Sequence, residues 1–224
     1  MVTPRIVSLV PSVTETLIAW GIEPVACTRF CEQPQLHHVG GTKDPDLAAI
    51  TDLLPDLVVV DQEENRREDH DALLAAGIAV HVLAVRDLAG LDAQMNRLAD
   101  AVGASWEPIG LLAEPSPTRR AWVPIWKRPW MALGEPTYGS AVLRALGIAN
   151  VAAPDGAYPQ VDPDAARSRG ADIVIAPSEP YPFAERHRDE LETVAATVFV
   201  DGRDLLWWGT RTHHALTRLA GVLP

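Results

Sequence analysis

Residues 87–117, DLAGLDAQMNRLADAVGASWEPIGLLAEPSP, separate two parts of the chain that follow one plan. The apolar residues of this stretch recur at helical spacing, at Leu91, Met95, Leu98 and Val102. Gly103 is a typical residue at the end of a helix. The pattern predicts a helix over residues 88–102, followed by a proline-rich linker at residues 114–117.

Two sequence echoes flank this predicted helix. Residues 44–60, DPDLAAITDLLPDLVVV, resemble residues 162–176, DPDAARSRGADIVIA. A second pair of similar segments lies upstream in the same order: AWGIEPVA at 19–26 precedes the first segment, and ALGIANVA at 145–152 precedes the second. The order favours an internal repeat and therefore two similar lobes. The alternative is chance similarity between segments that both lead from a helix into a strand.

Strand-like and helix-like segments alternate on both sides of residues 87–117, a pattern typical of parallel sheets covered by helices. We predict an α/β fold of two Rossmann-like lobes with mainly parallel sheets, joined by a single bridging helix. The predicted divisions are an N-terminal α/β lobe at 1–86, the bridging helix and linker at 87–117, and a C-terminal α/β lobe at 118–224. A ligand would lie in the cleft between the lobes.

Several local signals set the predicted element boundaries. Ser12 and Glu15 form a capping-box pattern that predicts a helix beginning near Val13. Asp44 is predicted to cap a helix with Pro45 in its first position, and Asp162 to cap one that begins with Pro163. Residues 120–126 are predicted to form one strand.

Composition restricts the class of protein. The chain has 224 residues, 47% of them hydrophobic and 22% charged, which is typical of a soluble globular protein. A net charge of -11 argues against nucleic acid as the main partner, and we expect no membrane span. The first residues, MVTPR, show no secretion signal, so we expect a cytoplasmic protein with reduced cysteines. An extracytoplasmic protein whose leader is missing from this sequence is the alternative.

Polar and aromatic residues follow the predicted strands, where ligands of parallel sheets bind. Ser12 opens a helix whose free N–H groups favour an anionic group. Large aromatic surfaces beside guanidinium groups suit a broad, flat or anionic ligand. The candidate ligand-binding residues are Ser12, Arg29, Phe30, Cys31, Lys43, Glu64, Trp130, Glu179, Tyr181, Trp207, Trp208 and Arg211. For the tryptophans among them the alternative is ordinary core packing, which we expect for Trp122.

Signatures of metal sites and of common enzymes are weak in this sequence. Cys27 and Cys31 lack a second pair of closely spaced ligands, so a protein-only metal site is not supported, and Cys31 is only a weak candidate for metal contact. The chain contains no G-x-G-x-x-G after its first strand, no P-loop, no G-x-S-x-G and no H-E-x-x-H. We therefore expect no catalytic residues.

Four segments resemble one known family. Residues 5–15, RIVSLVPSVTE, and residues 50–58, ITDLLPDLV, are similar to motifs of the periplasmic binding proteins for iron-siderophores and cobalamin. SEPYPF at 178–183 and WWGTR at 207–211 resemble segments of the cobalamin-binding-like branch. The resemblance implies two lobes bridged by one backbone helix, of the helical backbone metal receptor type, with a ligand in a shallow cleft. Receptors of this family carry a secretion signal, which this sequence does not show. The segments FC at 30–31, GGTK at 40–43 and EENR at 63–66 resemble a cytosolic-type subgroup.

The hypothesis that joins these observations is a soluble binding protein for a metal chelate, either corrinoid (cobalamin-like) or ferric siderophore. Aromatic residues would surround the ligand, and Arg29, Lys43 and Arg211 would face its anionic groups. Any bound corrinoid or iron chelate would be the ligand rather than a resident cofactor. The family resemblance implies an ABC transporter partner, which this sequence does not support because it shows no signal peptide. The alternatives are a cytosolic enzyme or chelatase-like protein that uses Cys31, Glu64 or Glu179, and an interaction protein without a small ligand.

Overall fold

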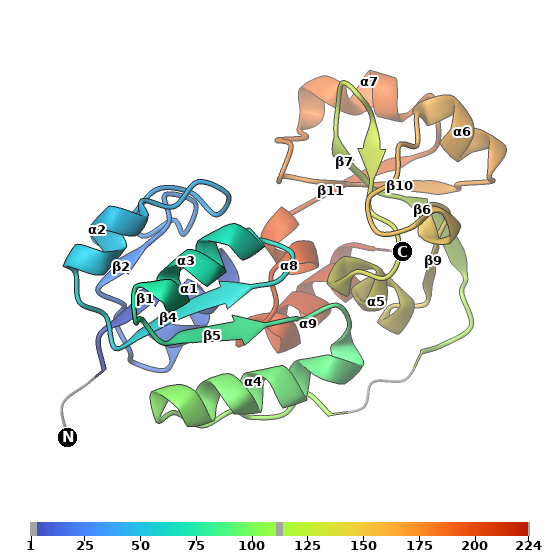
Figure 1. The fold of residues 1–224 in the computed structure, drawn as a ribbon. Coiled ribbons are helices and arrows are strands. Elements are labelled where there is room, and N and C mark those ends of the chain that lie inside the picture. The colour runs from blue at the N-terminus through green and yellow to red at the C-terminus, as the bar shows by residue number, and fades with distance from the viewer. Residues whose placement is uncertain (1–3, 111–113, 224) are drawn as a thin grey trace. The chain divides into compact units, whose positions relative to one another are not determined.

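The structure, a computed structural model, describes residues 4–110 and 114–223. The chain divides into two compact α/β units (Figure 1). The first unit comprises Met1–Val85, Leu91–Pro108 and Trp208–Thr210, and the second comprises Arg86–Gly90, Ile109–Trp207 and Arg211–Pro224. The units are therefore discontinuous in sequence, whereas the predicted divisions at 86 and 117 assumed contiguous lobes. Those divisions stay a prediction of the domain bounds.

The first unit contains a five-stranded sheet in the order β3-β2-β1-β4-β5. All four strand pairings are parallel, as predicted. The strands are β1 (Ile6–Ser8), β2 (Ala26–Cys27), β3 (His37–His38), β4 (Leu57–Asp61) and β5 (Val80–Leu83). β1 and β4 are central and almost fully buried, which explains their continuous apolar sequence.

Four helices accompany this sheet in the chain: α1 (Pro11–Ala19), α2 (Leu47–Asp52), α3 (Arg67–Ala75) and α4 (Leu88–Val102). Helix α4 has the bounds predicted from its apolar spacing. Leu91, Met95 and Leu98 are fully buried along one face, so burial of this stripe stabilises the helix. Within α4, the residues from Leu91 to Val102 belong to the first unit.

The second unit contains a four-stranded parallel sheet in the order β11-β10-β6-β9. Its strands are β6 (Arg119–Trp122), β9 (Ile148–Asn150), β10 (Ile173–Pro177) and β11 (Thr197–Val200). A separate antiparallel pair is formed by β7 (Pro124–Trp126) and β8 (Met131–Ala132). The two halves thus hold separate sheets, which confirms the predicted fold class.

Helices in the second unit are short. They are α5 (Tyr138–Ala145), α6 (Pro163–Ser168), α7 (Arg188–Leu191), α8 (Gly202–Leu206) and α9 (Thr212–Val222), with 3-10 turns η1 (Ala153–Asp155) and η2 (Glu185–His187). The core is built around Trp122, which is fully buried as expected, with Val174, Phe183 and Leu191.

Three local predictions were wrong. Helix α1 begins at Pro11 and Val10 is its N-cap, so Ser12 lies inside the first turn and makes no capping box. Proline is favoured in a first helical turn because it has no N–H to leave unpaired, and this preference decides the boundary. In α2 the cap is Asp46 rather than Asp44.

The third error concerns residues 120–126, which form two strands of different sheets rather than one strand. β6 ends at Trp122, and β7 begins at Pro124. Proline cannot donate a hydrogen bond to a neighbouring strand, so it disfavours continuation of β6 inside the sheet. The break turns the chain into the β7–β8 pair, which carries Trp126 and Trp130.

Gly209 lets the segment Trp208–Thr210 pack onto helix α1 within the first unit. Its φ angle is +114°, and a Cβ atom there would lie 2.2 Å from Thr16 Oγ1. The next residue, Thr210, donates its backbone N–H to the same hydroxyl at 3.3 Å. A larger residue at position 209 would be strained by its backbone angle and would also clash with Thr16.

The repeated Asp-Pro-Asp segments provide a stability test. Asp162 caps α6 by accepting the backbone N–H of Ala165 at 2.8 Å. We expect Asp162→Ala to lower the free energy of unfolding by about 0.5–2 kcal/mol, because one N–H of the first turn loses its partner. Asp164→Ala is the matched control, since Asp164 lies in the same first turn but forms an exposed ion pair with Arg167. Urea titrations check this, and equal losses in both variants would contradict the assigned cap.

Candidate functional site

Asn65 connects the strand ends of the first unit. Its Oδ1 accepts the backbone N–H of Asp61 at 2.8 Å, and its Nδ2 donates to the carbonyl oxygens of Leu9 at 3.2 Å and Thr42 at 3.0 Å. Asn65 is 8% exposed, so these partners would be costly to leave unpaired. The side chain thereby fixes the segments after β1 and β4 relative to the loop before α2.

The neighbouring carboxylate, Asp61, ends β4 and is buried. Its Oδ1 accepts the backbone N–H groups of Glu63 at 2.8 Å and Glu64 at 3.4 Å. Burial raises the pKa of Asp61, although these hydrogen bonds oppose the shift. The predicted site residue Glu64 therefore lies on a turn shaped by Asp61, before helix α3 rather than within it.

Cys31 lies at the end of a turn after β2 and is 2% exposed. Its Sγ accepts a hydrogen bond from Thr14 Oγ1 at 3.2 Å, and Thr28 Oγ1 lies at 3.2 Å from the same sulfur. The hydrogen bond from Cys27 lowers the pKa of Cys31 to about 6, and the two threonines add to the effect against the opposing influence of burial. In this structure Cys31 is thus enclosed rather than presented to a ligand.

The residues beside Cys31 are exposed. Phe30 is 50% exposed, and the Arg29 guanidinium lies 4.8 Å from its ring centroid. Arg29 also pairs with Asp44 at 3.0 Å. Lys43 donates to the backbone oxygen of Glu63 at 2.6 Å. Exposure and charge at Arg29, Phe30 and Lys43 suit contact with a ligand, whereas Ser12 is almost fully buried in α1.

An aromatic cluster follows the strands of the second unit. Trp130 stacks on Phe183 with ring centroids 6.0 Å apart and planes 6° apart, and Tyr181 packs against Phe183 at 4.7 Å. Trp126 meets Tyr181 edge-on at 5.8 Å and is 45% exposed. The structure therefore brings the predicted residues Trp130 and Tyr181 into one cluster and extends it to the surface through Trp126.

Sequence analysis missed Trp126 as a candidate site residue. The residue was counted as part of one long strand, whereas it closes β7 just before the turn that leads to Trp130. Pro124 was the available signal, because a proline two residues before Trp126 argues against a continuous inner strand.

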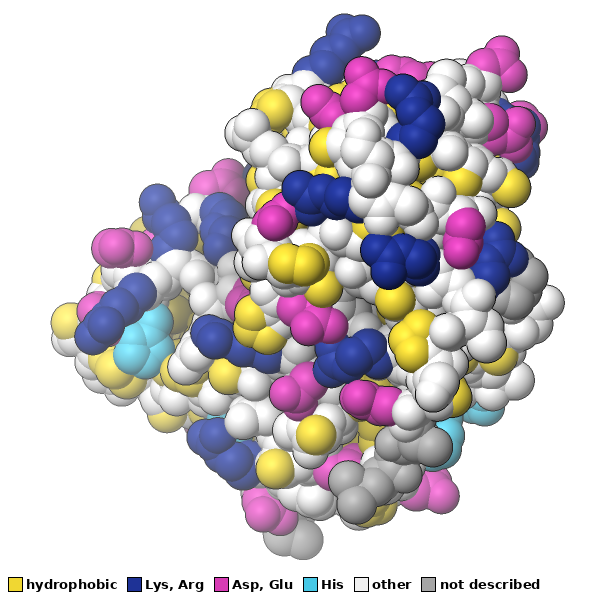
Figure 2. Space-filling model, turned by 90° about the vertical axis from the view of Figure 1, so that its right-hand side faces the viewer, with side chains coloured by type: hydrophobic (Ala, Val, Ile, Leu, Met, Phe, Trp, Pro, Cys, Tyr) yellow, Lys and Arg dark blue, Asp and Glu magenta, His cyan; other side chains and the backbone are white. Residues whose placement is uncertain are grey.

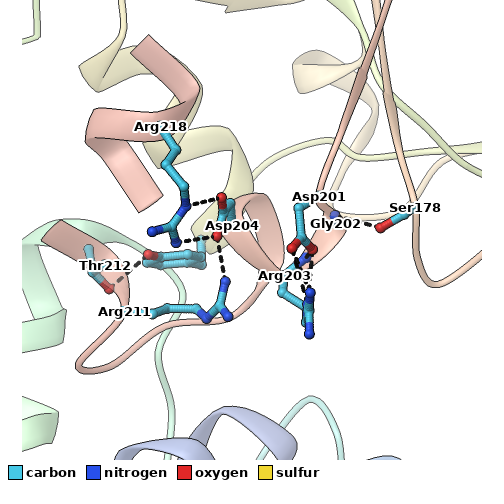
Figure 3. Close-up of polar contacts among 9 residues, drawn as sticks. Ser178, Asp201, Gly202, Arg203, Asp204, Arg211, Thr212 and Arg218 are labelled. Atoms are coloured by element: carbon cyan, nitrogen blue, oxygen red, sulfur yellow. Dashed lines mark hydrogen bonds and ion pairs between the residues drawn. The ribbon is translucent and has the colours of Figure 1, made fainter. Parts of the chain in front are cut away.

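Ser178 joins the carboxyl ends of β10 and β11. Its Oγ accepts the backbone N–H of Gly202 at 3.0 Å (Figure 3). A Cβ atom on Gly202 would lie 2.4 Å from Glu179 Cγ and 2.7 Å from Glu179 N, so only glycine fits this close approach. Glu179 is consequently held against the start of helix α8, at the edge of the sheet where ligands of parallel sheets bind.

A second carboxylate, Asp204, holds two arginines. Asp204 is buried and accepts hydrogen bonds from Arg211 Nη1 at 2.5 Å and from Arg218 Nε at 2.6 Å (Figure 3). Beside it Thr212 Oγ1 and the hydroxyl of Tyr138 lie 3.0 Å apart. Burial raises the pKa of Tyr138, so this hydroxyl keeps its proton. Arg211 is therefore fixed by Asp204, and its charge is partly compensated.

The two adjacent tryptophans have different surroundings. Trp207 is half-buried, and the Arg211 guanidinium lies 5.6 Å from its ring centroid. Trp208 is 4% exposed, so its ring is not available to a ligand in this structure. The sequence predicted that both tryptophans bind the ligand. In the structure Trp207 follows α8 and belongs to the second unit, whereas Trp208 belongs to the first. Of these two tryptophans, Trp207 is the one that combines partial exposure with a nearby cation.

The surface does not gather charge of one sign on the face drawn in Figure 2. Lys and Arg side chains there are interspersed with Asp and Glu side chains, and hydrophobic side chains lie between them. Binding of nucleic acid requires clustered positive charge, which this face does not offer. Within residues 4–110 and 114–223, no helix meets the length and apolarity needed to cross a membrane. Over the same residues, no three His, Cys, Asp or Glu side chains are grouped as metal ligands.

Residues 6–107 match the sequence model of the family described as "Periplasmic binding protein". No curated protein matches the chain. The matched residues include the motifs at 5–15 and 50–58 on which the predicted resemblance rests, apart from Arg5.

Solved structures share the fold over nearly the whole chain. The periplasmic vitamin B12-binding protein of Vibrio cholerae has a TM-score of 0.80 at 19% identity, covering 98% of this chain and 96% of that one. A periplasmic haem-binding protein in complex with two haems has a TM-score of 0.81 at 19% identity, with coverage of 98% and 97%. The periplasmic haem-binding protein of Vibrio cholerae has a TM-score of 0.78 at 19% identity, with coverage of 99% of each chain.

These comparisons correct the prediction of a cytoplasmic protein, which is wrong. The matching family and the similar structures are periplasmic binding proteins, which work outside the cytoplasm. The prediction relied on the absence of a recognisable secretion signal, and such an absence does not locate a protein. The sequence match over residues 6–107 and the fold shared over nearly the whole chain confirm the predicted resemblance to the periplasmic binding proteins.

Proposed function

We propose that this protein is an extracytoplasmic binding protein for a metal chelate, which it holds without chemical change. The observation that carries the proposal is the aromatic cluster of the second unit, in which the half-exposed Trp126 ring is supported edge-on by Tyr181 at 5.8 Å. An aromatic ring that is both rigid and accessible suits a broad, flat ligand. The ligand's expected position in a cleft stays a prediction.

The ligand class follows from the chemistry of the candidate residues. Trp126, Trp207 and Phe30 offer partly exposed aromatic faces, and Arg29 and Arg211 place guanidinium groups beside two of those rings. Each unit thus offers a partly exposed ring beside a guanidinium group, and this pairing suits a macrocycle with polar or anionic edge groups. The fold is shared with a vitamin B12-binding protein and a haem-binding protein, which supports a corrinoid or haem-type tetrapyrrole as the ligand. A ferric siderophore is the second chelate class to test.

The proposed partner is an ABC transporter. One structural relative, from Listeria monocytogenes, is an ABC transporter substrate-binding protein, with a TM-score of 0.72 at 14% identity. A binding protein of this kind needs no membrane span of its own, because the transporter crosses the membrane. Fractionation of the native host tests the proposed location, and recovery in the cytoplasmic fraction alone would contradict it.

Equilibrium titration tests the proposed function directly. Cyanocobalamin, haem and a ferric siderophore are added separately to the purified protein. One of them should quench its tryptophan fluorescence and bind at a defined stoichiometry. The bound molecule should be recovered unchanged after denaturation. A protein that binds none of the three classes, or that converts the ligand to another molecule, would contradict the proposal.

Trp126→Ala should weaken binding of the ligand identified in this titration at least tenfold, equivalent to about 1.4 kcal/mol. The physical reason is the loss of a supported aromatic face that contributes about 1.5–3 kcal/mol when it is fully used. Leu74→Ala is the matched control, since Leu74 is similarly exposed at 49% but lies on helix α3 of the first unit. Equal dissociation constants for wild type and Trp126→Ala would exclude Trp126 from the site.

The adjacent tryptophans should respond differently to replacement. Trp208→Ala should lower the free energy of unfolding by about 3–5 kcal/mol, because the 4% exposed ring leaves a cavity. Trp207→Ala should cost less stability and should weaken ligand binding, since Trp207 is half-buried beside Arg211. Thermal melting without ligand, followed by titration, separates the two effects. Similar melting losses in both variants would place Trp207 in the core as well.

A further inference from the structure

The two cysteines are neighbours in a buried cluster that the proposed function does not use. Cys27 is the last residue of β2, and a turn closed by the hydrogen bond from Cys31 N to Thr28 O at 3.1 Å brings the chain back to it. Both thiols are free in this structure and pack with Leu36 and Ile18. The turn thus places a second sulfur beside the end of the strand.

The surroundings of Cys31 favour its thiolate, which is the form that attacks a disulfide. Thr14 donates its hydroxyl to the sulfur at 3.2 Å, and Thr28 Oγ1 lies at the same distance. The pKa of Cys31 is lowered, first by the hydrogen bond from Cys27, whereas the pKa of Cys27 is raised by its hydrogen bond with Cys31 and by burial. Because the two threonine hydroxyls stabilise negative charge on the Cys31 sulfur, we assign Cys31 as the attacking group and Cys27 as the resolving group.

We propose that Cys27 and Cys31 form a reversible disulfide by exchange with an external disulfide, in the folded protein. The Cys31 thiolate attacks one sulfur of the external disulfide, forms a mixed disulfide and releases one thiolate. Cys27 then loses its proton and attacks the Cys31 sulfur, which releases the second thiolate. The cysteines lose two electrons, and the external disulfide takes them up as it becomes two thiols.

Access to the sulfur requires a local opening of the segment that follows β2. Cys31 and Leu36 are its buried apolar anchors, whereas most residues of 29–35 are exposed. A segment with so few buried contacts opens at a lower free energy than the sheet core. The reaction is therefore expected to be slower than that of an exposed thiol and to proceed without global unfolding.

The crosslink would constrain the turn that carries Arg29 and Phe30. These two residues form a cation–π pair at 4.8 Å, and Arg29 pairs with Asp44 at 3.0 Å. Closing the ring between positions 27 and 31 limits the conformations of this turn when the segment opens. The disulfide itself does not depend on the identity of any ligand.

Mass spectrometry of the native protein tests the proposal. The folded protein is incubated with oxidised glutathione, quenched with acid, and only then unfolded for counting of free thiols. We expect wild type to lose both thiols and two hydrogens in mass, to carry no glutathione, and to recover both thiols with dithiothreitol. Two remaining thiols, or oxidation that occurs only when denaturant is present during incubation, would overturn the proposal.

Single variants assign the order of attack. Cys27→Ser should stop at a glutathione adduct on Cys31, because no second thiol is present to resolve it. Cys31→Ser should react at Cys27 at least tenfold more slowly under the same native conditions. Faster modification of Cys27 than of Cys31, or a stable glutathione adduct on wild type, would contradict the assigned roles. The wild-type measurement remains decisive if either variant fails to fold.

Discussion

The candidate site depends on one constraint, the parallel pairing of the central strands in each unit. Parallel strands end at the same edge of a sheet, so residues far apart in sequence arrive together. Asn65 enforces this in the first unit through hydrogen bonds to Asp61, Leu9 and Thr42. In the second unit, Ser178 plays the comparable role when it accepts the N–H of Gly202. The exposed aromatic and cationic residues have defined positions because their strand ends do.

In the second unit, a buried carboxylate fixes neighbouring guanidinium groups near the strand ends, so these charges are already paired before any ligand binds. Asp204 holds Arg211 and Arg218, and Arg211 in turn lies over Trp207. Removing one member of such a network leaves a buried charge unpaired, which costs more than an exposed ion pair contributes. The proposed binding surface therefore consists mainly of aromatic side chains, and carboxylates fix the positions of its guanidinium groups.

Much of the fold could be predicted from sequence because its signals are local. The apolar spacing of α4 gave its bounds, and Asp162 before Pro163 gave the start of α6. The predictions were wrong where two local signals conflict. Helix α1 begins at Pro11 despite the capping pattern at Ser12, and Pro124 divides one predicted strand into two. The burial of Trp208 and of Cys31 and the exposure of Trp126 depend on tertiary packing, which neighbouring residues in sequence do not reveal.

The central claim, that the protein carries a metal chelate, is tested most directly on protein isolated from its own host. Native mass spectrometry, with a visible absorption spectrum of the same sample, identifies any molecule that co-purifies. The account predicts an intact metal chelate whose absorption bands disappear from the protein fraction after denaturation and appear in the small-molecule fraction. A stoichiometrically bound metal-free solute, such as a sugar or an amino acid, would contradict it.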